Sequence, residues 1–220
     1  MSVNKEKYLE IIQLLKNKAT LVAVSKFKSI EDIQALYDLG QRDFGENFVQ
    51  ELVLKYEALP KDIRWHYIGH LQRNKVKYIA SFVHLIHGVD SEKLLIEIDK
   101  QGEKNNRVID CLLQVHIAEE ETKFGFDSTE LEELTTRIFE ANPAGFRNVS
   151  IRGLMGMAYF TDDQEKIRNE FKKLHSLYST LNGKRSTSNL LSMGMSGDYS
   201  IALEEGSNMV RIGSLIFGGR

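Results

Sequence analysis

The 220-residue chain has little cysteine and little proline, and both shortages exclude classes of protein. Its single cysteine, Cys111, lies in an apolar stretch, which excludes an intramolecular disulfide and a cysteine-based metal cluster. Only two prolines and no long Ser/Gly-rich stretch leave no place for a flexible linker. We therefore expect one domain over residues 1–220, in a reducing, cytoplasmic setting.

The chain also lacks an excess of one charge and a long hydrophobic run. Its 29 Lys and Arg residues face 31 Asp and Glu, and a net charge of -2 argues against a nucleic-acid partner. No apolar run approaches the roughly 18 residues of a membrane-spanning helix, and the N-terminus has no signal-peptide apolar region. A hydrophobic content of 42% instead predicts a sizeable core and no membrane partner.

Several catalytic signatures are missing as well. The chain has no Gly-x-Ser-x-Gly elbow, Walker A loop or Gly-x-Gly-x-x-Gly motif, so serine hydrolase, NTPase and dinucleotide-binding functions lack their usual patterns. His66 lies on a predicted strand whose alternate residues point inward, whereas His84, His87, His116 and His175 are scattered without metal-ligand spacing. We therefore predict no metal site.

What the sequence does contain is a repeated alternation of short apolar runs and amphipathic segments. The run over 21–25 is continuous and rich in β-branched residues, which is typical of a strand buried on both faces of a parallel sheet. Ser29 can cap the helix that follows, and Gly40 ends it. Further strands are predicted at 43–45, 65–68, 85–89, 111–117, 151–155, 189–192 and 209–211.

Helical segments separate these predicted strands. Asp127 and Glu130 have capping-box spacing and predict a helix, with Pro143 beyond its end. An apolar stripe over 167–181 predicts a long helix that packs on the core. A charged amphipathic helix over 1–19 precedes the first strand. Its apolar side is predicted to carry Tyr8, Ile11, Ile12, Leu14 and Leu15.

Eight strand and helix units within 220 residues are close to the minimum for a (β/α)8 TIM barrel. We predict this α/β fold, with the extra N-terminal helix. An open doubly wound sheet is the main alternative. No near-identical repeat is present, which disfavours a solenoid.

In such a barrel the active face lies at the C-terminal ends of the strands, and Lys26 is the first candidate there. A lysine directly after an apolar strand is partly desolvated, which favours the neutral amine as a nucleophile towards an aldehyde or ketone. Schiff-base chemistry is its natural use. The structural alternative is that Lys26 extends to solvent, as Lys28 beside it would.

Two Gly/Ser loops follow the last two predicted strands. Gly213 and Ser214 follow the eighth strand and are typical of a phosphate-binding loop in a barrel. Ser192 and Ser196 flank a glycine after the seventh strand, and Ser196 is predicted to offer a helix N-terminus. Both loops can converge on one phosphate, although each alone is also typical of an ordinary turn.

Two further groups can line the same face. Arg211 ends the eighth strand, which neighbours the first strand in a closed barrel, so its guanidinium can lie beside a ligand on Lys26. A structural ion pair is the alternative for Arg211. Glu46 and Asn47 follow the second strand and are predicted to share one face, where they can bind a polar ring substituent. Helix capping is the alternative for Asn47.

Spaced motifs throughout the chain resemble the YggS/PROSC family of pyridoxal phosphate homeostasis proteins. The motifs are Ala-Val-Ser-Lys at 23–26, Phe-Gly-Glu-Asn at 44–47, Trp-His-Tyr-Ile-Gly at 65–69, Leu-Gln-x-Asn-Lys at 71–75, Lys-x-Gly at 123–125, and the segments 152–157, 191–198 and 210–218. They occur in the same order as in the family and span essentially the whole chain.

The resemblance implies a fold-type III barrel for pyridoxal 5′-phosphate (PLP), similar to the barrel domain of alanine racemases. It implies PLP as the cofactor, held as a Schiff base on Lys26. An arginine at the ring nitrogen weakens the ring as an electron sink. By motif position, the remaining cofactor-binding residues are Ser192, Gly213 and Ser214 at the phosphate, with Ser196 added, Arg211 facing the pyridine nitrogen, and Asn47 and Met193 lining the ring.

The function implied by the resemblance is PLP homeostasis: the protein binds PLP, buffers it and delivers it to PLP-dependent apo-enzymes, which influences amino-acid and keto-acid balance. We expect a monomer with no catalytic residue, although weak racemase-like activity stays open. The alternative is an amino-acid racemase-like enzyme. Related racemases need a second domain and a partner subunit, for which a chain ending at Arg220 leaves no length. A third possibility is a phosphosugar-binding barrel that uses Lys26 as a Schiff-base lysine.

Overall fold

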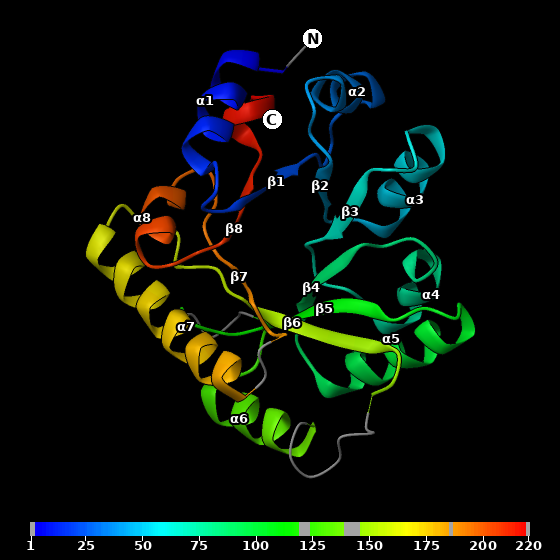
Figure 1. The fold of residues 1–220 in the computed structure, drawn as a ribbon, viewed down its shortest axis with the longest axis vertical. Helices are drawn as coiled ribbons and strands as arrows, with labels where there is room; N and C mark the ends of the chain where they lie inside the picture. The colour runs from blue at the N-terminus through cyan, green and yellow to red at the C-terminus, as the bar shows by residue number, and fades with distance from the viewer. Residues whose placement is uncertain (1–2, 119–123, 139–145, 185–186, 219–220) are drawn as a thin grey trace.

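The strands and helices of the protein alternate along the chain, and the helices surround the strands (Figure 1). The computed structural model describes residues 3–118, 124–138, 146–184 and 187–218. The predicted positions of Pro143 and Lys123 lie outside these ranges.

The strands form a closed barrel in which neighbours in sequence are neighbours in space. β1 (Thr20–Val24) pairs in parallel with β8 (Met209–Ile212) and so closes the barrel. Val22 lies opposite Arg211 in that pair, which confirms the predicted neighbourhood of the first and last strands. The closure confirms the predicted (β/α)8 barrel and excludes the open doubly wound sheet.

Between β1 and β8 the strands follow one another around the barrel in the order of the sequence. The other strands are β2 (Asp43–Glu46), β3 (Arg64–Tyr67), β4 (Leu85–Val89), β5 (Ile109–Gln114), β6 (Val149–Met155) and β7 (Leu190–Ser192).

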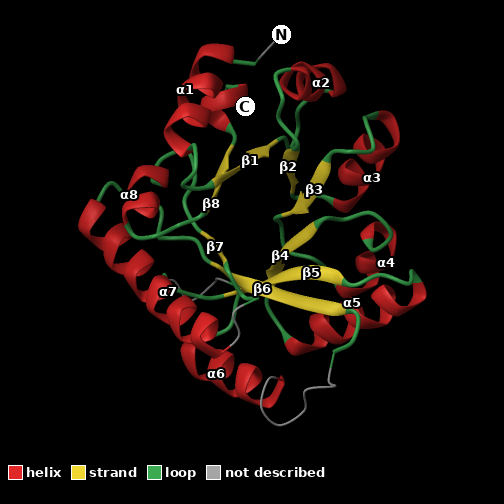
Figure 2. Cartoon of the chain, viewed as in Figure 1, coloured by secondary structure: helices red, strands yellow, loops and turns green. Residues whose placement is uncertain are grey.

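Helices follow every strand, α1 precedes the first one, and together they form the outer ring in Figure 2. They are α1 (Lys5–Leu15), α2 (Ile30–Asp38), α3 (Val49–Ala58), η1 (Arg73–Lys75), α4 (Val76–Ile79), α5 (Glu92–Lys104), α6 (Ser128–Thr136), α7 (Gln164–Lys184), α8 (Tyr199–Glu204) and α9 (Ser214–Phe217). Even the 21-residue α7 lacks the apolar stretch that a membrane span requires, and the same holds for the other described helices.

The helix starts follow the predicted capping chemistry. Ser29 accepts a hydrogen bond from the backbone N–H of Asp32 at the start of α2. Asp127 and Glu130 form the predicted reciprocal capping box of α6. The capping residues therefore identified both helix starts from sequence alone.

The N-terminal helix α1 buries fewer residues than predicted. Only Tyr8, Ile11 and Leu15 are buried, whereas Ile12 and Leu14 are 37% and 44% exposed. A helix face repeats every three to four residues, so five apolar residues within eight positions cannot all face the core. The helix packs beside α9, where Asn4 N–H donates to the backbone oxygen of Ile216 at 2.7 Å.

The fifth strand lies two residues earlier than predicted at its start and ends at Gln114 instead of residue 117. From Val115 onward the backbone pairs with a segment after the strand. Val115 forms an isolated bridge with Phe126, and His116 N–H donates to the Phe126 oxygen at 2.9 Å. The residues of the apolar run that lie beyond the barrel strand thus pair with Phe126 and not with a neighbouring strand.

Two apolar layers hold the barrel. Most core residues lie in the layer between the strands and the surrounding helices, including Phe44, Trp65 and Phe171. A second cluster fills the barrel interior with Val22, Leu85, Leu112, Met155 and Met209. Since side chains alternate along a strand, one strand can contribute to both layers, as β1 does with Ala23 in the first and Val22 in the second.

One glycine allows β6 to approach β7 closely. Gly153 has a φ of 147°, and a Cβ atom there would lie 1.8 Å from the backbone oxygen of Leu190. No other residue fits this position without movement of a strand. The close approach of β7 therefore explains why the motif at 152–157 has a glycine at position 153.

Candidate functional site

A cavity of about 1060 Å³ lies at the carboxyl-terminal ends of β1 and β8. Parallel strands of a barrel all end at this face, so residues far apart in sequence meet there. Five of the eight predicted site residues line the cavity: Lys26, Ser196, Arg211, Gly213 and Ser214. The structure thus brings the candidate Schiff-base lysine next to both Gly/Ser loops.

Lys26 reaches this cavity from the turn that follows β1. Val24, two residues earlier, also lines the cavity, as the alternation of side chains along a strand requires. Lys26 is half-buried. The next residue, Phe27, has a φ of 63°, in the left-handed region that a bulky side chain rarely adopts. The chain therefore turns sharply just after the candidate lysine.

Side chains of α3 hold this turn. The Phe27 N–H donates to Glu51 Oε1 at 2.6 Å, and Lys55 Nζ donates to the backbone oxygen of Ser25 at 2.7 Å. Lys55 is buried and also donates to Glu46 Oε1 at 2.8 Å and Glu51 Oε1 at 2.6 Å. One buried ammonium therefore links β1, β2 and α3 beneath the turn.

Glu46 lies in an unusual environment for a carboxylate. Burial raises its pKa to about 7, although Lys55 and the hydroxyl of Ser25 lower it. Oε1 accepts from Ser25 Oγ at 2.5 Å, whereas Oε2 is buried without a hydrogen-bond partner among the described residues. The prediction that Glu46 and Asn47 share a face is wrong, because Glu46 faces Lys55 of α3, whereas Asn47 lies in the bend after β2 and lines a cavity that Glu46 does not line.

The two Gly/Ser loops meet through a direct hydrogen bond. Gly213 N–H donates to Ser196 Oγ at 3.3 Å. A Cβ atom on Gly213 would come within 3.1 Å of both the Cβ and the backbone oxygen of Val24, so glycine keeps this loop close to β1. Ser214 is the first residue of α9, and the first residues of a helix leave backbone N–H groups without intrahelical partners.

Ser196 does not occupy a helix N-terminus, which corrects the prediction. α8 begins at Tyr199 and Asp198 is its N-cap residue, so Ser196 lies in the preceding turn. The turn is closed by Asp198 Oδ1, which accepts from the Met195 N–H at 2.5 Å. The side chain of Asp198 forms this turn and makes no capping hydrogen bond to the helix, and Ser196 lines the cavity.

Arg211 is the buried cation of the site. Nη1 donates to the oxygen and hydroxyl of Ser192 at 3.0 and 2.6 Å, and Nη2 donates to the backbone oxygen of Gly156 at 3.0 Å. Burial lowers the pKa of Arg211 to about 10, and the more distant Asp198 raises it. The guanidinium thus stays charged at neutral pH. No carboxylate of a described residue forms an ion pair with it, so the alternative of a structural ion pair is not observed.

Three predicted residues lie away from this cavity. Asn47 lines a separate cavity of about 500 Å³, and its Oδ1 is buried without a partner among the described residues. The N-cap of α3 is Phe48, so Asn47 does not cap that helix. Met193 is fully buried in the layer between strands and helices, and Ser192 is buried in the barrel interior. The ring-lining roles of Asn47 and Met193 stay predictions.

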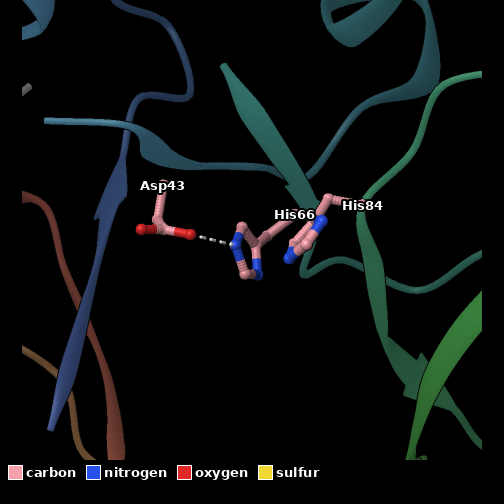
Figure 3. A group of neighbouring side chains, drawn as sticks. All are labelled: Asp43, His66 and His84. Atoms are coloured by element: carbon pink, nitrogen blue, oxygen red, sulfur yellow. Dashed lines mark hydrogen bonds and ion pairs between the residues drawn. The ribbon is translucent and has the colours of Figure 1, made fainter. Parts of the chain in front are cut away.

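The structure also gathers residues that the sequence analysis left scattered. Asp43 on β2, His66 on β3 and His84 before β4 lie together at the barrel end opposite the cavity, and Figure 3 shows their side chains. Asp43 Oδ1 lies 3.0 Å from His66 Nε2, and His66 also contacts His87. The interpretation of His84 and His87 as scattered is therefore wrong in space.

The sequence contains a signal for part of the Lys55 ion pairs and for part of the histidine cluster. The spacing of Glu51 and Lys55 is that of an ion pair within one helix. Strand periodicity also predicts that His66 points inward. Neither signal identifies Glu46 or His87 as the partner, because the register between strands decides which inward residues meet.

The chain is similar over almost its whole length to proteins of one family. Residues 4–220 match the family model described as the alanine racemase N-terminal domain. A pyridoxal phosphate homeostasis protein of Aquifex aeolicus is 43% identical over 206 residues, which cover 93% of this chain and 88% of that protein. The protein of the same name from Synechocystis is 38% identical and covers 97% of both chains.

Solved structures show the same likeness. PipY of Synechococcus elongatus, solved with PLP bound, has a TM-score of 0.85 and 31% identity, and the match covers 97% of this chain and 99% of PipY. The PLP-free form has a TM-score of 0.89. The alanine racemase of Bartonella henselae has a TM-score of 0.72 at 18% identity, over 97% of this chain and 59% of the racemase, which shows a shared fold.

Proposed function

The chain belongs to the family of the alanine racemase N-terminal domain and, within it, to the pyridoxal phosphate homeostasis proteins; from this premise we propose that it binds PLP reversibly as a Schiff base on Lys26. In this proposal the protein buffers the cofactor and delivers it to PLP-dependent apo-enzymes, and it has no dedicated catalytic activity. We further propose a cytoplasmic monomer in which residues 1–220 form one domain.

One observation carries the proposal: the amine of Lys26 lines the same cavity as Arg211, a buried cation that has no ion-pair partner among the described residues. Lys26, Lys28 and Arg211 bring three positive charges to it, whereas Asp198 is the only acidic residue among the described lining residues. A desolvated cation strongly favours an anionic ligand, because the charge is otherwise costly to bury. A phosphate ester with an aldehyde group matches both the cations and the amine.

The donors at the cavity fit a phosphate group. Because Gly213 N–H donates to Ser196 Oγ, the hydroxyl hydrogen of Ser196 is left to donate to a phosphate oxygen. Ser214 adds a second hydroxyl and the backbone N–H groups at the start of α9. We therefore assign the phosphate to Ser196 and Ser214, whereas Gly213, which was predicted to bind it, donates its only N–H to Ser196 Oγ and is assigned to the support of the loop. Ser192 was predicted to join them, but its hydroxyl bonds to Arg211 and we assign it to the support of that residue.

The remaining residues orient the ligand. When bound, PLP supplies an aldehyde for Schiff-base formation and a ring that can act as an electron sink. Arg211 can only donate hydrogen bonds, so facing the ring nitrogen it would leave that nitrogen unprotonated and limit carbanion chemistry. Lys55 and Glu51 hold the turn that presents Lys26. These roles favour storage of the cofactor over turnover.

The test is an absorbance spectrum of the purified protein with PLP, before and after borohydride reduction, followed by peptide mass mapping. We expect a reducible band and a modification on Lys26, and loss of both in Lys26→Ala. Lys28→Ala is the matched control, since Lys28 lines the same cavity and should not carry the modification. Absence of a band, or modification of Lys28 instead, would contradict the proposal.

A second assay separates storage from catalysis. The loaded protein is incubated with L- and D-amino acids, and racemisation is followed over time. We expect little or no turnover. Sustained multiple turnover would replace the homeostasis function with the racemase-like alternative, while leaving the PLP site in place.

A further inference from the structure

A continuous series of hydrogen bonds crosses the barrel interior beneath the cavity. Asp43 Oδ1 lies 3.0 Å from His66 Nε2, and His66 Nδ1 lies 2.9 Å from His87 Nε2. His87 Nδ1 lies 3.1 Å from Ser192 Oγ, which accepts a 2.6 Å hydrogen bond from Arg211. All five side chains are buried. The series, here called the interior chain, links the start of β2 to the guanidinium at the cavity.

The charge of Asp43 sets the direction of the interior chain. Burial alone would raise the pKa of Asp43, but hydrogen bonds from Arg64 and His66 outweigh it and lower the pKa to about 2. The carboxylate is therefore ionised at neutral pH and can only accept hydrogen bonds. It follows that His66 carries a proton on Nε2 and donates it to Asp43, the contact drawn as a dashed line in Figure 3.

The direction of donation between His66 and Asp43 also decides which atoms donate in the next hydrogen bonds. A neutral His66 with its proton on Nε2 accepts at Nδ1, so His87 donates from Nε2. Burial, more than any neighbouring charge, lowers the pKa of His87 well below its usual value, which keeps that ring neutral. Nδ1 of His87 then accepts from the hydroxyl of Ser192, whose oxygen accepts from Arg211.

The opposite assignment leaves a hydrogen without an acceptor. If His66 carried protons on both nitrogens, His87 would donate from Nδ1 to Ser192 Oγ, which already accepts from Arg211. The hydroxyl hydrogen of Ser192 would then find no acceptor in the contacts of the described residues. Buried polar groups are as a rule hydrogen-bonded, so the direction towards Asp43 is favoured.

A metal ion is the competing explanation of this cluster. Asp43, His66 and His84 offer ligand atoms within 4.8 Å of one another. However, Arg64 donates to both oxygens of Asp43 and so brings a positive charge to the place where a cation would bind. The second nitrogen of His66 is engaged by His87. These contacts favour the hydrogen-bonded arrangement.

We propose that Asp43, His66 and His87 are positioning residues that act through Ser192 on Arg211. They keep the Ser192 hydroxyl directed away from the cavity, so that its oxygen holds the guanidinium and offers no hydrogen to a ligand. The inference rests on the proposed function, because the placement of Arg211 matters only where PLP binds in this cavity. A change at the opposite end of the barrel should therefore alter the cofactor site.

The decisive variant is Asp43→Asn, which keeps the shape of the side chain and removes its charge. Arg64 donates through Nη2 to Oδ2 and through Nε to Oδ1, the oxygen that also faces His66. We expect the amide oxygen to keep the Nη2 contact and the amide NH2 group to take the place of Oδ1, where it faces His66. His66 must then accept at Nε2, and its proton moves to Nδ1. His87 is forced to the same tautomer, and the direction of the whole interior chain reverses.

The first readout is nitrogen NMR of histidine-labelled protein without PLP. We expect His66 and His87 in the Nε2–H form in the wild type and in the Nδ1–H form in Asp43→Asn. Nδ1–H forms in the wild type, or one tightly bound zinc ion per chain in the purified protein, would overturn the interior chain. This measurement does not depend on PLP binding.

The second readout is PLP affinity and the absorbance spectrum of bound PLP. We expect about tenfold weaker binding and a shifted band in Asp43→Asn, as for the loss of a hydrogen bond to a charged group. The matched control is Asp110→Asn, which removes a carboxylate that pairs with Arg152 on β6 outside the interior chain. Reversed tautomers with unchanged affinity and spectrum would overturn the positioning role. Failure of the wild type to bind PLP would instead overturn the proposed function.

Discussion

Asp43 and Glu46 stand at the two ends of β2, yet they behave as opposite kinds of carboxylate. Asp43 points into the barrel, where hydrogen bonds from Arg64 and His66 outweigh burial and lower its pKa to about 2. Glu46 points to α3, where burial outweighs Lys55 and raises its pKa to about 7. Burial acts in the same direction on both groups, so the number of donors decides the result.

The count of hydrogen bonds explains the difference. Both oxygens of Asp43 accept, from Arg64 and from His66. Glu46 concentrates its contacts on Oε1 and leaves Oε2 buried without a partner among the described residues. In this pair the carboxylate whose two oxygens both accept hydrogen bonds is the one stabilised as an anion. The two carboxylates also belong to different supports of the cavity. Asp43 contacts the histidine rings inside the barrel, and Glu46 belongs to the ion pairs of Lys55 between the strands and α3.

Removal of Lys55 should have the largest effect on this comparison. Lys55→Met leaves Glu46 buried without a cation and releases the backbone oxygen of Ser25. We expect the free energy of unfolding to fall by about 3–5 kcal/mol, measured by urea denaturation. Lys16→Met, at an exposed position, is the control and should change it by less than about 0.5 kcal/mol. An equal effect of both variants would show that the buried ion pairs contribute nothing.

Glu46→Gln should change how stability depends on pH. The pKa of Glu46 is higher in the folded chain than in the unfolded chain, so the folded state binds the proton more tightly. The stability that this proton binding contributes is fully present below about pH 4.5 and is lost as the pH rises through about 7. The stability of the wild type relative to Glu46→Gln should therefore fall between these values, by at most about 3 kcal/mol. A rise of the relative stability over the same range would mean that the effect of Lys55 on the pKa of Glu46 outweighs that of burial.

Asp43→Asn should show the opposite sign, which sharpens the comparison. The folded pKa of Asp43 lies below its unfolded value, so the contribution is present above about pH 4 and is lost as the pH falls towards 2. We expect the wild type to lose up to about 2 kcal/mol relative to Asp43→Asn in this acid range. Unfolding titrations at several pH values measure both variants together. A parallel pH response of the two variants would contradict the assigned pKa shifts.

Phe27→Asn should have the smallest effect and concerns the turn above the Lys55 network. Asparagine adopts left-handed backbone more readily than phenylalanine, so we expect stabilisation of up to about 1 kcal/mol in thermal unfolding. Phe27 is 56% exposed, and the centroid of its ring lies 5.2 Å from that of Phe48. Phe48→Asn is the control, because it removes the ring pair without relieving the turn. Equal destabilisation in both variants would assign the effect to the ring contact.

The fold could be predicted largely from local patterns. Short apolar runs such as 21–25, capping residues such as Ser29, and the capping box at Asp127 act within a few residues of chain. Such interactions are visible in a sequence because they depend on spacing alone. The end of β5 could not be predicted in this way, because its apolar run continues into a pairing with Phe126.

The candidate site was predictable to a different degree. Lys26, Arg211 and Gly213 could be found because strand ends meet at one face of any parallel barrel. The pairing of Glu46 with Lys55 required the packing of α3 on β2. The family resemblance supplied roles for residues, whereas contacts came from the structure.

Sequence alone determined the order of strands and helices, the helix caps and the lysine that follows the first strand, because each depends on residues close together in the chain. The tertiary structure decided which polar groups meet. His87 and Ser192 lie 105 positions apart and bond only because barrel closure and strand register place both side chains in the interior. Asp43 and Glu46 likewise acquire opposite pKa shifts from partners on other elements, since hydrogen bonds and burial depend on distance in space.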